Sequence, residues 1–184
     1  CISAIEIKKK GFDVVVIDQS SIGSGSSWAA GGILFPLMPW NYSKKVYELC
    51  NPSTIYYQEL AKELYEETGI DSQFKESGLA IVNPFNIDAI QDWCTQNNIE
   101  SSIDTSRSKK KITLKKICQI RPPRLMKALK RYMKTIGIEI FENKKIISFD
   151  ENKGEIKSCT TSEGRVFESQ AFLLSSGAWT SKIL

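Results

Sequence analysis

The sequence predicts an α/β fold, and three stretches of it support that prediction. Residues 2–11 form the pattern of the last turns of an amphipathic helix, and an apolar run from Phe12 to Ile17 then ends on Asp18. Continuous apolar runs of this length are typical of parallel strands that are covered on both faces. A ribbon rich in glycine and serine follows Asp18, and near the other end of the chain the run FLLSS leads into Gly177 and Ala178. A helix that leads into a buried strand ending on an acid is half of a βαβ unit.

The first part of the chain contains clear helix signals. Lysines precede Gly11, which is the expected stop for the first helix. Helices are predicted at 43–50 and 53–68, separated by Asn51-Pro52, and Gly69 ends the second. One apolar face is expected on this second helix, made of Ile55, Leu60, Ala61, Leu64 and Tyr65.

A short strand is predicted at 78–82 and a helix at 87–96, with Ile90, Trp93 and Cys94 facing inward. Residues 100–111 are polar and are predicted to be irregular. Pro122 and Pro123 then open a strongly periodic helix that Gly137 closes. Strands are expected at 138–141, 145–149, 155–160, 165–167 and 171–175.

Composition limits the classes of protein to consider. The 184 residues are 41% hydrophobic and 25% charged, which is ordinary for a globular protein. No apolar run approaches the roughly 20 residues that cross a bilayer, so no membrane span is expected. The first residues, CISAIEIKKKGF, have neither an initiator Met nor the pattern of a signal peptide, and they suggest a chain that begins inside an element.

The residue types exclude several kinds of catalysis. The chain has no histidine, which removes Ser–His and Cys–His nucleophiles and makes a zinc site improbable. The five cysteines are scattered and form no CxxC, as expected of buried or incidental thiols in a reducing cytoplasm. No metal site is predicted. Chemistry must therefore come from another residue type or from a cofactor.

A basic stretch runs from residue 105 to 138, with twelve Lys or Arg and no Asp or Glu. Such a run attracts nucleic acid or an acidic surface in some proteins. Tyr132 is its only aromatic residue, however, and bases need aromatic side chains to stack on. The pattern favours a solvated loop and a helix with a basic outer face, and does not favour nucleic acid as a partner.

Asp18 is the first candidate site residue. In a dinucleotide-binding βαβ unit, an acid at the end of the second strand accepts hydrogen bonds from the adenosine ribose. That acid falls about 20 residues after a GxGxxG fingerprint, which would here end just before Cys1. A turn residue is the alternative for an Asp in this place, and the sequence alone leaves both open.

The ribbon after Asp18 is the second candidate. Small residues at 24–27 and 29–32 let the backbone approach a flat or anionic ligand. A flexible linker is the alternative, but the ribbon runs into an apolar segment that needs burial, Ile33, Leu34, Phe35, Leu37, Met38 and Trp40. The ribbon is therefore predicted to be an ordered loop that lines a site. The third candidate is the strand end at Ser175-Ser176-Gly177-Ala178, where backbone passes close to a pyrophosphate in such folds.

These segments, together with YEETGIDSQFKESGLAIV and QIRPPRLMKALKRYMKTIGIEIFE, resemble the D-amino-acid-oxidase group of flavoproteins. Within that group they are most similar to the glycine oxidases of thiamine biosynthesis. The resemblance covers essentially the whole chain. It implies a Rossmann-like FAD-binding domain with an inserted α+β substrate domain, both incomplete in this chain.

The resemblance implies a domain for each stretch of the chain. Residues 1–42 would be the first part of the FAD-binding domain, lacking strand 1 and its GxGxxG. Residues 43–118 would begin the substrate domain, and 119–184 would continue the FAD-binding domain.

The resemblance also implies site residues for FAD. Asp18 and Gln19 would bind the adenosine ribose, and the backbone of Ile146 would meet the adenine. The ribbon would follow the pyrophosphate, ribityl chain and flavin through Ser26, Ser27, Ala30, Gly31, Gly32 and Ile33. Gly177 and Ala178 would form the second phosphate-side loop.

The catalytic residues are unknown and are expected beyond Leu184, together with the arginine that binds the substrate carboxylate. Arg121 and Arg124 are candidates for that role by residue type, but their place at a helix start favours a structural or solvated role. This 184-residue chain alone is expected to bind FAD weakly or not at all.

The activity implied is oxidative deamination of glycine or a similar small amino acid or amine. A hydride would pass from the substrate α-carbon to flavin N5, the imine would hydrolyse to an oxo acid and ammonia, and oxygen would reoxidise the flavin to give hydrogen peroxide. The alternatives are a sarcosine-oxidase-like or D-amino-acid dehydrogenase flavoenzyme, a tRNA-modifying flavoprotein that uses residues 105–138, and a binding module without turnover. The oligomeric state stays open, a homo-oligomer included.

Overall fold

The computed structural model describes residues 1–36, 38–84, 86–106 and 110–182. Leu37 of the apolar segment and Arg107 and Lys109 of the basic stretch lie outside the described residues. The chain divides into two compact units, residues 1–24 with 133–184 and residues 25–132. The domain boundaries suggested by the sequence remain a prediction, and the two units are described separately.

The first unit contains the half βαβ unit. Helix α1 (Ile2–Lys9) buries Ala4 and Ile5 and is followed by Gly11, whose φ is +88°. Strand β1 (Val15–Ile17) pairs in parallel with β8 (Glu139–Phe141), with Ile17 opposite Phe141. The predicted parallel strand is therefore confirmed, although only its last three residues form the ladder.

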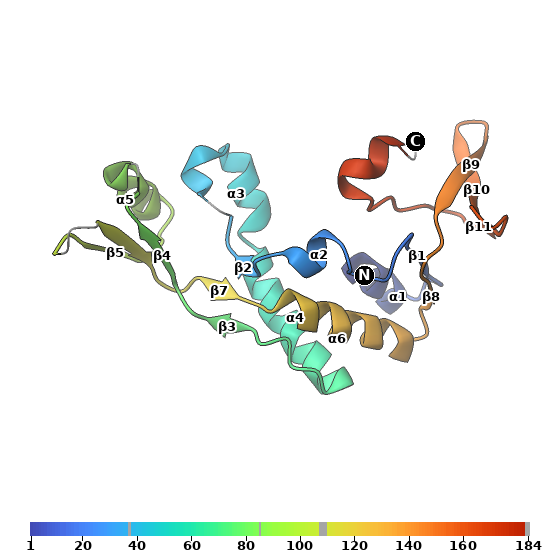
Figure 1. The fold of residues 1–184 in the computed structure, drawn as a ribbon, viewed down its shortest axis with the longest axis horizontal. Helices are drawn as coiled ribbons and strands as arrows, with labels where there is room; N and C mark the ends of the chain where they lie inside the picture. The colour runs from blue at the N-terminus through green and yellow to red at the C-terminus, as the bar shows by residue number, and fades with distance from the viewer. Residues whose placement is uncertain (37, 85, 107–109, 183–184) are drawn as a thin grey trace. The chain divides into compact units, whose positions relative to one another are not determined.

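An antiparallel sheet follows in the same unit, with the strand order β11-β10-β9. Its strands are β9 (Ile146–Asn152), β10 (Glu155–Thr161) and β11 (Val166–Glu168), which Figure 1 shows as a twisted hairpin with a third short strand. The predicted strands at 145–149, 155–160 and 165–167 are confirmed. A 3₁₀ helix, η2 (Gly177–Lys182), comes next in the chain.

The prediction of a strand at 171–175 is wrong, because these residues form no ladder in the structure. The segment has the apolar composition of a strand, but Leu173 keeps 64% of its surface exposed. A strand exists only where a neighbour supplies hydrogen-bonding partners, and no described strand pairs with this segment.

The second unit begins with the ribbon. Helix α2 (Ser26–Ala29) is followed by β2 (Ile33–Leu34), the 3₁₀ helix η1 (Pro39–Asn41) and α3 (Lys44–Cys50). Strand β2 belongs to a small antiparallel sheet of order β2-β7-β3, with β7 at Cys118–Gln119 and β3 at Lys75–Glu76. The sequence predicted that the whole ribbon is an ordered loop. In the structure a short helix, α2, forms within it and strand β2 follows it, so the ribbon is a loop only in part.

A second antiparallel sheet in this unit has the order β4-β6-β5. Its strands are β4 (Leu79–Val82), β5 (Ser101–Asp104) and β6 (Lys111–Leu114). Helix α5 (Ile87–Gln96) buries Ile90 and Cys94 in one cluster with Ile112 and Leu114 of β6, and Trp93 packs against that cluster. Figure 1 shows α5 beside this sheet.

The prediction that 100–111 is irregular is therefore wrong for residues 101–104, which form β5, and for Lys111, the first residue of β6. In β5, Ile103 packs against the core cluster and Ser102 is exposed, while Ile112 and Leu114 of β6 are buried. This alternation marks a sheet with one covered face. Because residues 101–104 are mostly polar, the sequence did not predict β5.

Two longer helices remain: one lies in the second unit, and the other has residues 122–132 in the second unit and residues 133–135 in the first. Helix α4 (Ser53–Thr68) ends where Gly69 adopts a left-handed conformation, and it buries Leu60, Ala61 and Leu64. Ile55 and Tyr65 keep 68% and 57% of their surface exposed, so their assignment to the buried face is wrong. At 100° per residue, Tyr65 lies at the edge of the covered stripe, whereas Ile55 lies on the opposite side of the helix from Leu64.

Helix α6 (Pro122–Thr135) begins at the predicted proline pair and follows the expected period. It buries Leu125, Ala128, Leu129, Tyr132 and Met133. The Tyr132 hydroxyl donates to Glu63 Oε1 of α4 at 2.6 Å and thereby connects the two helices. Among the residues that the structure describes, no helix combines the length and apolar character that a bilayer crossing needs.

Candidate functional site

Asp18 lies directly after β1, at the carboxyl end of the parallel β1–β8 pair. Its Oδ1 accepts a hydrogen bond from the Ser20 backbone N–H at 2.8 Å, so the carboxylate folds back over the loop that follows. This is the only hydrogen bond of the Asp18 carboxylate among the described contacts, so Oδ2 accepts none there, and the carboxylate also interacts electrostatically with the Cys1 ammonium. Both readings of Asp18 from the sequence, a turn residue and a ribose ligand, fit this geometry.

The loop from Asp18 to Ile22 is held by the residues that follow β8. The Asp18 N–H donates to Phe141 O at 2.9 Å, and the Lys144 N–H donates to Asp18 O at 2.9 Å. Asn143 N–H donates to Ser20 O at 3.2 Å, and Ile22 N–H donates to Glu142 Oε1 at 2.8 Å. The acid-bearing loop therefore has a defined conformation, although it lies at the surface.

Other predicted site residues of the first unit lie around this frame. Gln19 is exposed beside Asp18, and Ile146 is half-buried at the start of β9, opposite Thr161. Gly177 and Ala178 are exposed at the start of η2, and Gly177 adopts a φ of +56°. No hydrogen bond in the described part of the chain connects η2 to the Asp18 loop, so the joint role of these residues remains a prediction.

The ribbon residues belong to the second unit. Ser26 and Ser27 start α2, and Ala30, Gly31 and Gly32 connect it to Ile33 of β2. Of these six residues, Gly32 is half-buried and the other five are exposed. An exposed stretch of small residues is open to a ligand along its length, but its place beside Asp18 also remains a prediction.

Gly32 has the clearest structural requirement in the ribbon. Its φ is +74°, and a Cβ at this position would lie 2.0 Å from the carbonyl oxygen of Ile120. The Ile120 N–H donates to Gly32 O at 2.8 Å, next to the β2–β7 ladder. The close approach of two backbones therefore requires glycine here, whatever ligand the ribbon binds.

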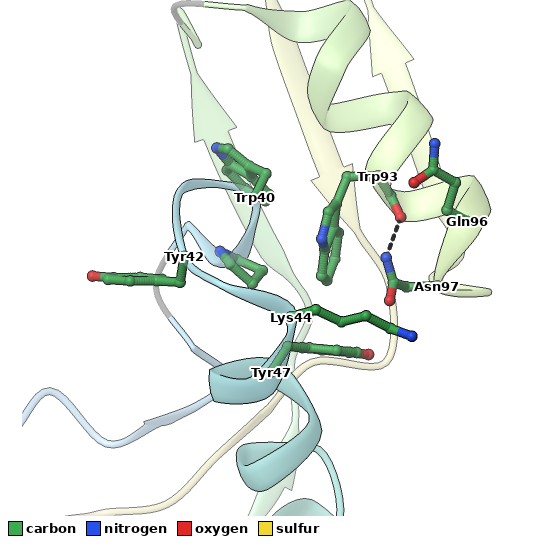
Figure 2. Close-up of a pocket in the computed structure, with 8 residues that line it drawn as sticks. Trp40, Tyr42, Lys44, Tyr47, Trp93, Gln96 and Asn97 are labelled. Carbon is green, nitrogen blue, oxygen red and sulfur yellow. Dashed lines mark hydrogen bonds between the residues drawn. The ribbon is translucent and has the colours of Figure 1, made fainter.

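The second unit also contains a pocket of about 410 Å³. Figure 2 shows Trp93 of α5 facing the segment from η1 to α3 across this pocket. The residues that line it are Pro39, Trp40, Tyr42, Lys44, Tyr47, Trp93, Gln96 and Asn97. None of the predicted FAD residues is among them.

Trp93 is the centre of the packing at this pocket. Its ring makes edge contacts with Phe35, Trp40 and Tyr47 at centroid distances of 6.3, 6.0 and 4.9 Å. Asn97 Nδ2 donates to Trp93 O at 2.8 Å (Figure 2), and burial raises the pKa of the Tyr47 hydroxyl. Lys44 is 3.2 Å from Glu48, so its charge is compensated. The cluster packs Phe35 and Trp40 of the apolar segment after the ribbon, as the sequence predicted for that segment. Ile33 and Met38 each keep 44% of their surface exposed, so the predicted burial is wrong for these two residues.

Arg121 and Arg124 have structural contacts. Arg124 Nε donates to the carbonyl oxygen of Asp71, and Arg121 donates to Gln73 Oε1 at 3.5 Å. Both arginines thus hold the segment after α4 at the start of α6. These contacts fit the structural role that the sequence favoured for them over substrate binding.

The basic stretch is partly neutralised by acids from elsewhere in the chain. Lys115 and Lys116 both pair with Glu100, and the hydrogen bond from Lys115 lowers the pKa of that carboxyl. Ion pairs between exposed groups add little stability, but they reduce the field that a polyanion would meet.

The described residues include no cluster of three or more His, Cys, Asp or Glu that would hold a metal ion. The five cysteines are free thiols, and Cys94, Cys118 and Cys159 are buried. Burial raises the pKa of each of these three thiols, which makes them poor nucleophiles near neutral pH.

Two features of the site were not predicted from the sequence. Glu142 binds the Asp18 loop from 120 positions away, and Trp93 gathers aromatic residues from three other segments. No local pattern marks Glu142, because its partner is a backbone N–H. The four tryptophans of the sequence could have directed attention to Trp93, but nothing in their spacing shows which residues they meet.

Comparison with known proteins gives the same family over the whole chain. A family model described as DAO, FAD dependent oxidoreductase, matches residues 1–184. A glycine oxidase of Pseudomonas putida strain KT2440 is 30% identical over 196 aligned residues, which cover 100% of this chain and 53% of that protein. A glycine oxidase of Pseudomonas aeruginosa is 24% identical and has 54% of its length covered. The chain thus spans about half the length of the curated relatives it matches.

Solved structures show the same fold. The glycine oxidase of Bacillus cereus superposes with a TM-score of 0.85 at 24% identity, over 98% of this chain and 53% of that one. The glycine oxidase of Geobacillus kaustophilus gives a TM-score of 0.86 at 22% identity with the same coverage. These likenesses confirm the predicted fold class.

Proposed function

Since the chain belongs to the DAO family of FAD-dependent oxidoreductases, we propose that the full-length protein oxidises glycine or a similar small amino acid or amine. The family membership confirms the resemblance that the sequence motifs indicated, and it makes FAD the cofactor. The observation that carries the choice of substrate is the match to glycine oxidases along the whole of this chain.

The residues of the first unit fit the adenosine end of FAD. A carboxylate at the carboxyl end of a parallel strand accepts hydrogen bonds from ribose hydroxyls, and Asp18 has in that place an oxygen, Oδ2, that accepts none among the described contacts. Gln19 lies beside it, and the backbone of Ile146 would meet the adenine. Gly177 and Ala178 would supply backbone near the pyrophosphate.

The ribbon would follow the rest of the cofactor. Ser26, Ser27 and Ala30 are exposed, so their hydroxyl and backbone groups are open to phosphate oxygens. Gly31, Gly32 and Ile33 would lie along the ribityl chain and flavin. Gly31 and Gly32 have no side chain, which lets the backbone before Ile33 approach a flat ring.

When bound, FAD would supply the redox chemistry, a two-electron oxidation of the substrate amine with oxygen as the final acceptor and hydrogen peroxide as its product. This chain's part is to bind and orient, since it contains no histidine and its buried thiols are poor nucleophiles. The imine product would hydrolyse to an oxo acid and ammonia. Free thiols fit a reducing compartment, and the cytoplasm is the proposed location.

The test is anaerobic reduction of the full-length protein. We expect it to purify yellow or to become yellow with added FAD, and glycine should bleach the visible flavin absorption without oxygen. Admission of air should restore the colour and release hydrogen peroxide. A protein that stays colourless with FAD would overturn the flavin assignment.

Two other outcomes separate the alternatives. Bleaching by sarcosine or a D-amino acid with no response to glycine would assign the protein to those substrates. Bleaching without peroxide on admission of air would show a dehydrogenase that uses another electron acceptor.

A further inference from the structure

Residues 141–145 run from the last residue of β8 to the residue before β9. They contact both the Asp18 loop and a turn of the antiparallel sheet. We call them the bridge segment. On its first side it makes the four hydrogen bonds to residues 18–22 described above, one of them from Ile22 N–H to the Glu142 carboxylate. The carboxylate is the only side-chain group among these four contacts on the bridge side.

On its second side, the bridge segment contacts the turn between β10 and β11, residues 161–165. Ser162 N–H donates to Lys145 O at 2.8 Å, and Lys144 Nζ pairs with Glu163. The Arg165 guanidinium lies 4.1 Å from the ring centroid of Phe141 and 4.7 Å from that of Phe167. The two rings also make an edge contact with each other, at 4.9 Å.

The turn itself is firmly held, so it can act as an anchor. Thr161 is fully buried; its N–H donates to Arg165 O at 2.9 Å, and its hydroxyl accepts from Arg165 N–H at 3.2 Å. These bonds fix the backbone from which the guanidinium reaches Phe141. A planar cation stacked on an aromatic face is attracted by the charge distribution of the ring, so the guanidinium connects the anchored turn to Phe141.

We infer that Glu142 and Arg165 are positioning residues that fix the Asp18 loop for binding the adenosine ribose of FAD. Glu142 acts on the loop directly through Ile22, and Arg165 acts through Phe141, whose carbonyl oxygen accepts from the Asp18 N–H. The inference rests on the proposed function, because it assumes that Asp18 binds FAD. It adds two residues, 142 and 165, that do not touch the ligand.

The experiment measures the dissociation constant of FAD for the full-length apoprotein by quenching of flavin fluorescence. Glu142→Ala should weaken FAD binding about five- to tenfold, the effect of losing one hydrogen bond, and Arg165→Met about two- to fivefold, the effect of losing one stacking contact. Glu142→Gln keeps an acceptor oxygen for Ile22 N–H and should bind FAD within about twofold of the parent protein.

The matched control is Lys157→Met. Lys157 lies on β10 of the same sheet and pairs with Glu155, so the change removes one cation without touching the bridge segment. It should leave FAD affinity unchanged. The melting temperature of each apoprotein shows whether a variant is folded. Where the larger changes prevent folding, Glu142→Asp, which is one methylene too short to reach Ile22 N–H, and Arg165→Lys, which lacks the planar stacking group, should weaken FAD binding in the same direction.

A double-mutant cycle with Asp18→Asn separates positioning from general stability. If Glu142 acts through Asp18, then Glu142→Ala should have almost no further effect on FAD affinity in the Asp18→Asn protein. Additive losses would overturn the inference, and so would normal FAD affinity in the folded Glu142→Ala and Arg165→Met variants. A parent protein that binds no FAD would instead overturn the proposed function and, with it, this inference.

Discussion

At the residue scale, Gly32 occupies a position that excludes any side chain. Its φ of +74° and the 2.0 Å approach of a Cβ to Ile120 O together require the backbone to move. We expect Gly32→Ala to lower the free energy of unfolding by about 1–3 kcal/mol, because strain in the left-handed region adds to a backbone clash. Urea denaturation followed by circular dichroism would measure the change.

The neighbouring glycine is the control for that prediction. Gly31 has nothing within 4 Å of a Cβ and is not in the left-handed region. Gly31→Ala should therefore change stability little. Equal effects of the two substitutions would contradict the account of Gly32.

Asp18 shows how one residue serves both structure and ligand. Its Oδ1 caps the loop through Ser20 N–H, and Oδ2 accepts no hydrogen bond within the described residues. A carboxylate has about four acceptor sites, so one oxygen can hold the loop while the other binds a hydroxyl. The two readings of Asp18 are therefore compatible, and only ligand binding tests the second.

At the element scale, α5 depends on a side-chain cap. Asn86 Oδ1 accepts from the Ala89 N–H at 3.1 Å and satisfies one of the unpaired donors of the first turn. Asn86→Ala should lower the free energy of unfolding by about 1 kcal/mol. Thermal or urea unfolding of the two proteins at one pH would give the value.

Helix α3 offers the matched control. Ser43 occupies its N-cap position, but its side chain makes no cap hydrogen bond. Ser43→Ala should therefore cost much less than Asn86→Ala. If the Ser43 variant lost as much stability as the Asn86 variant, the cap at Asn86 would not be the cause.

Helices and strands differ in how well the local sequence predicts them. Helices α4, α5 and α6 begin or end at local signals, such as Gly69 and the Pro122-Pro123 pair. Strands β5 and β6 have no such signal, and residues 171–175 have the composition of a strand without forming one. Hydrogen bonds within a helix join residues four apart, whereas a ladder needs a partner from elsewhere in the chain.

At the scale of the whole molecule, the thiols report on which parts are closed to solvent. Cys94, Cys118 and Cys159 are buried with raised pKa values, while Cys1 and Cys50 are partly exposed. We expect a maleimide to label only Cys1 and Cys50 quickly in the native protein, as mass spectrometry of intact and digested chains would show.

Conditions that unfold the chain should expose all five thiols. In the native state Cys94, Cys118 and Cys159 should label slowly, because thiolate is the reactive form and burial both hides these three thiols and raises their pKa. Rapid native labelling of Cys94 would contradict its place in the core of the second unit.

The chain matches its family along its whole length while spanning about half of each curated relative. Whole-protein properties, including substrate and electron acceptor, therefore depend on experiments with the full-length protein. The fold and the FAD family do not depend on them, since they rest on this chain alone.

Sequence patterns alone predicted helices α1, α3, α4, α5 and α6, the parallel strand β1 and the family. Each of these depends on neighbouring residues or on a motif: a helix period, a glycine stop, an apolar run that ends on Asp18. The sequence also located the ribbon and the apolar segment that follows it.

The other features of the fold depend on contacts between segments that are distant in the sequence. Pairing with β6 made β5 a strand although residues 101–104 are mostly polar, residues 171–175 found no ladder partner, and Glu142 and Arg165 came to lie beside the Asp18 loop and Phe141. The physical reason is the same in each case. These contacts join segments that are far apart in the chain, so their energy depends on a partner that no local pattern specifies.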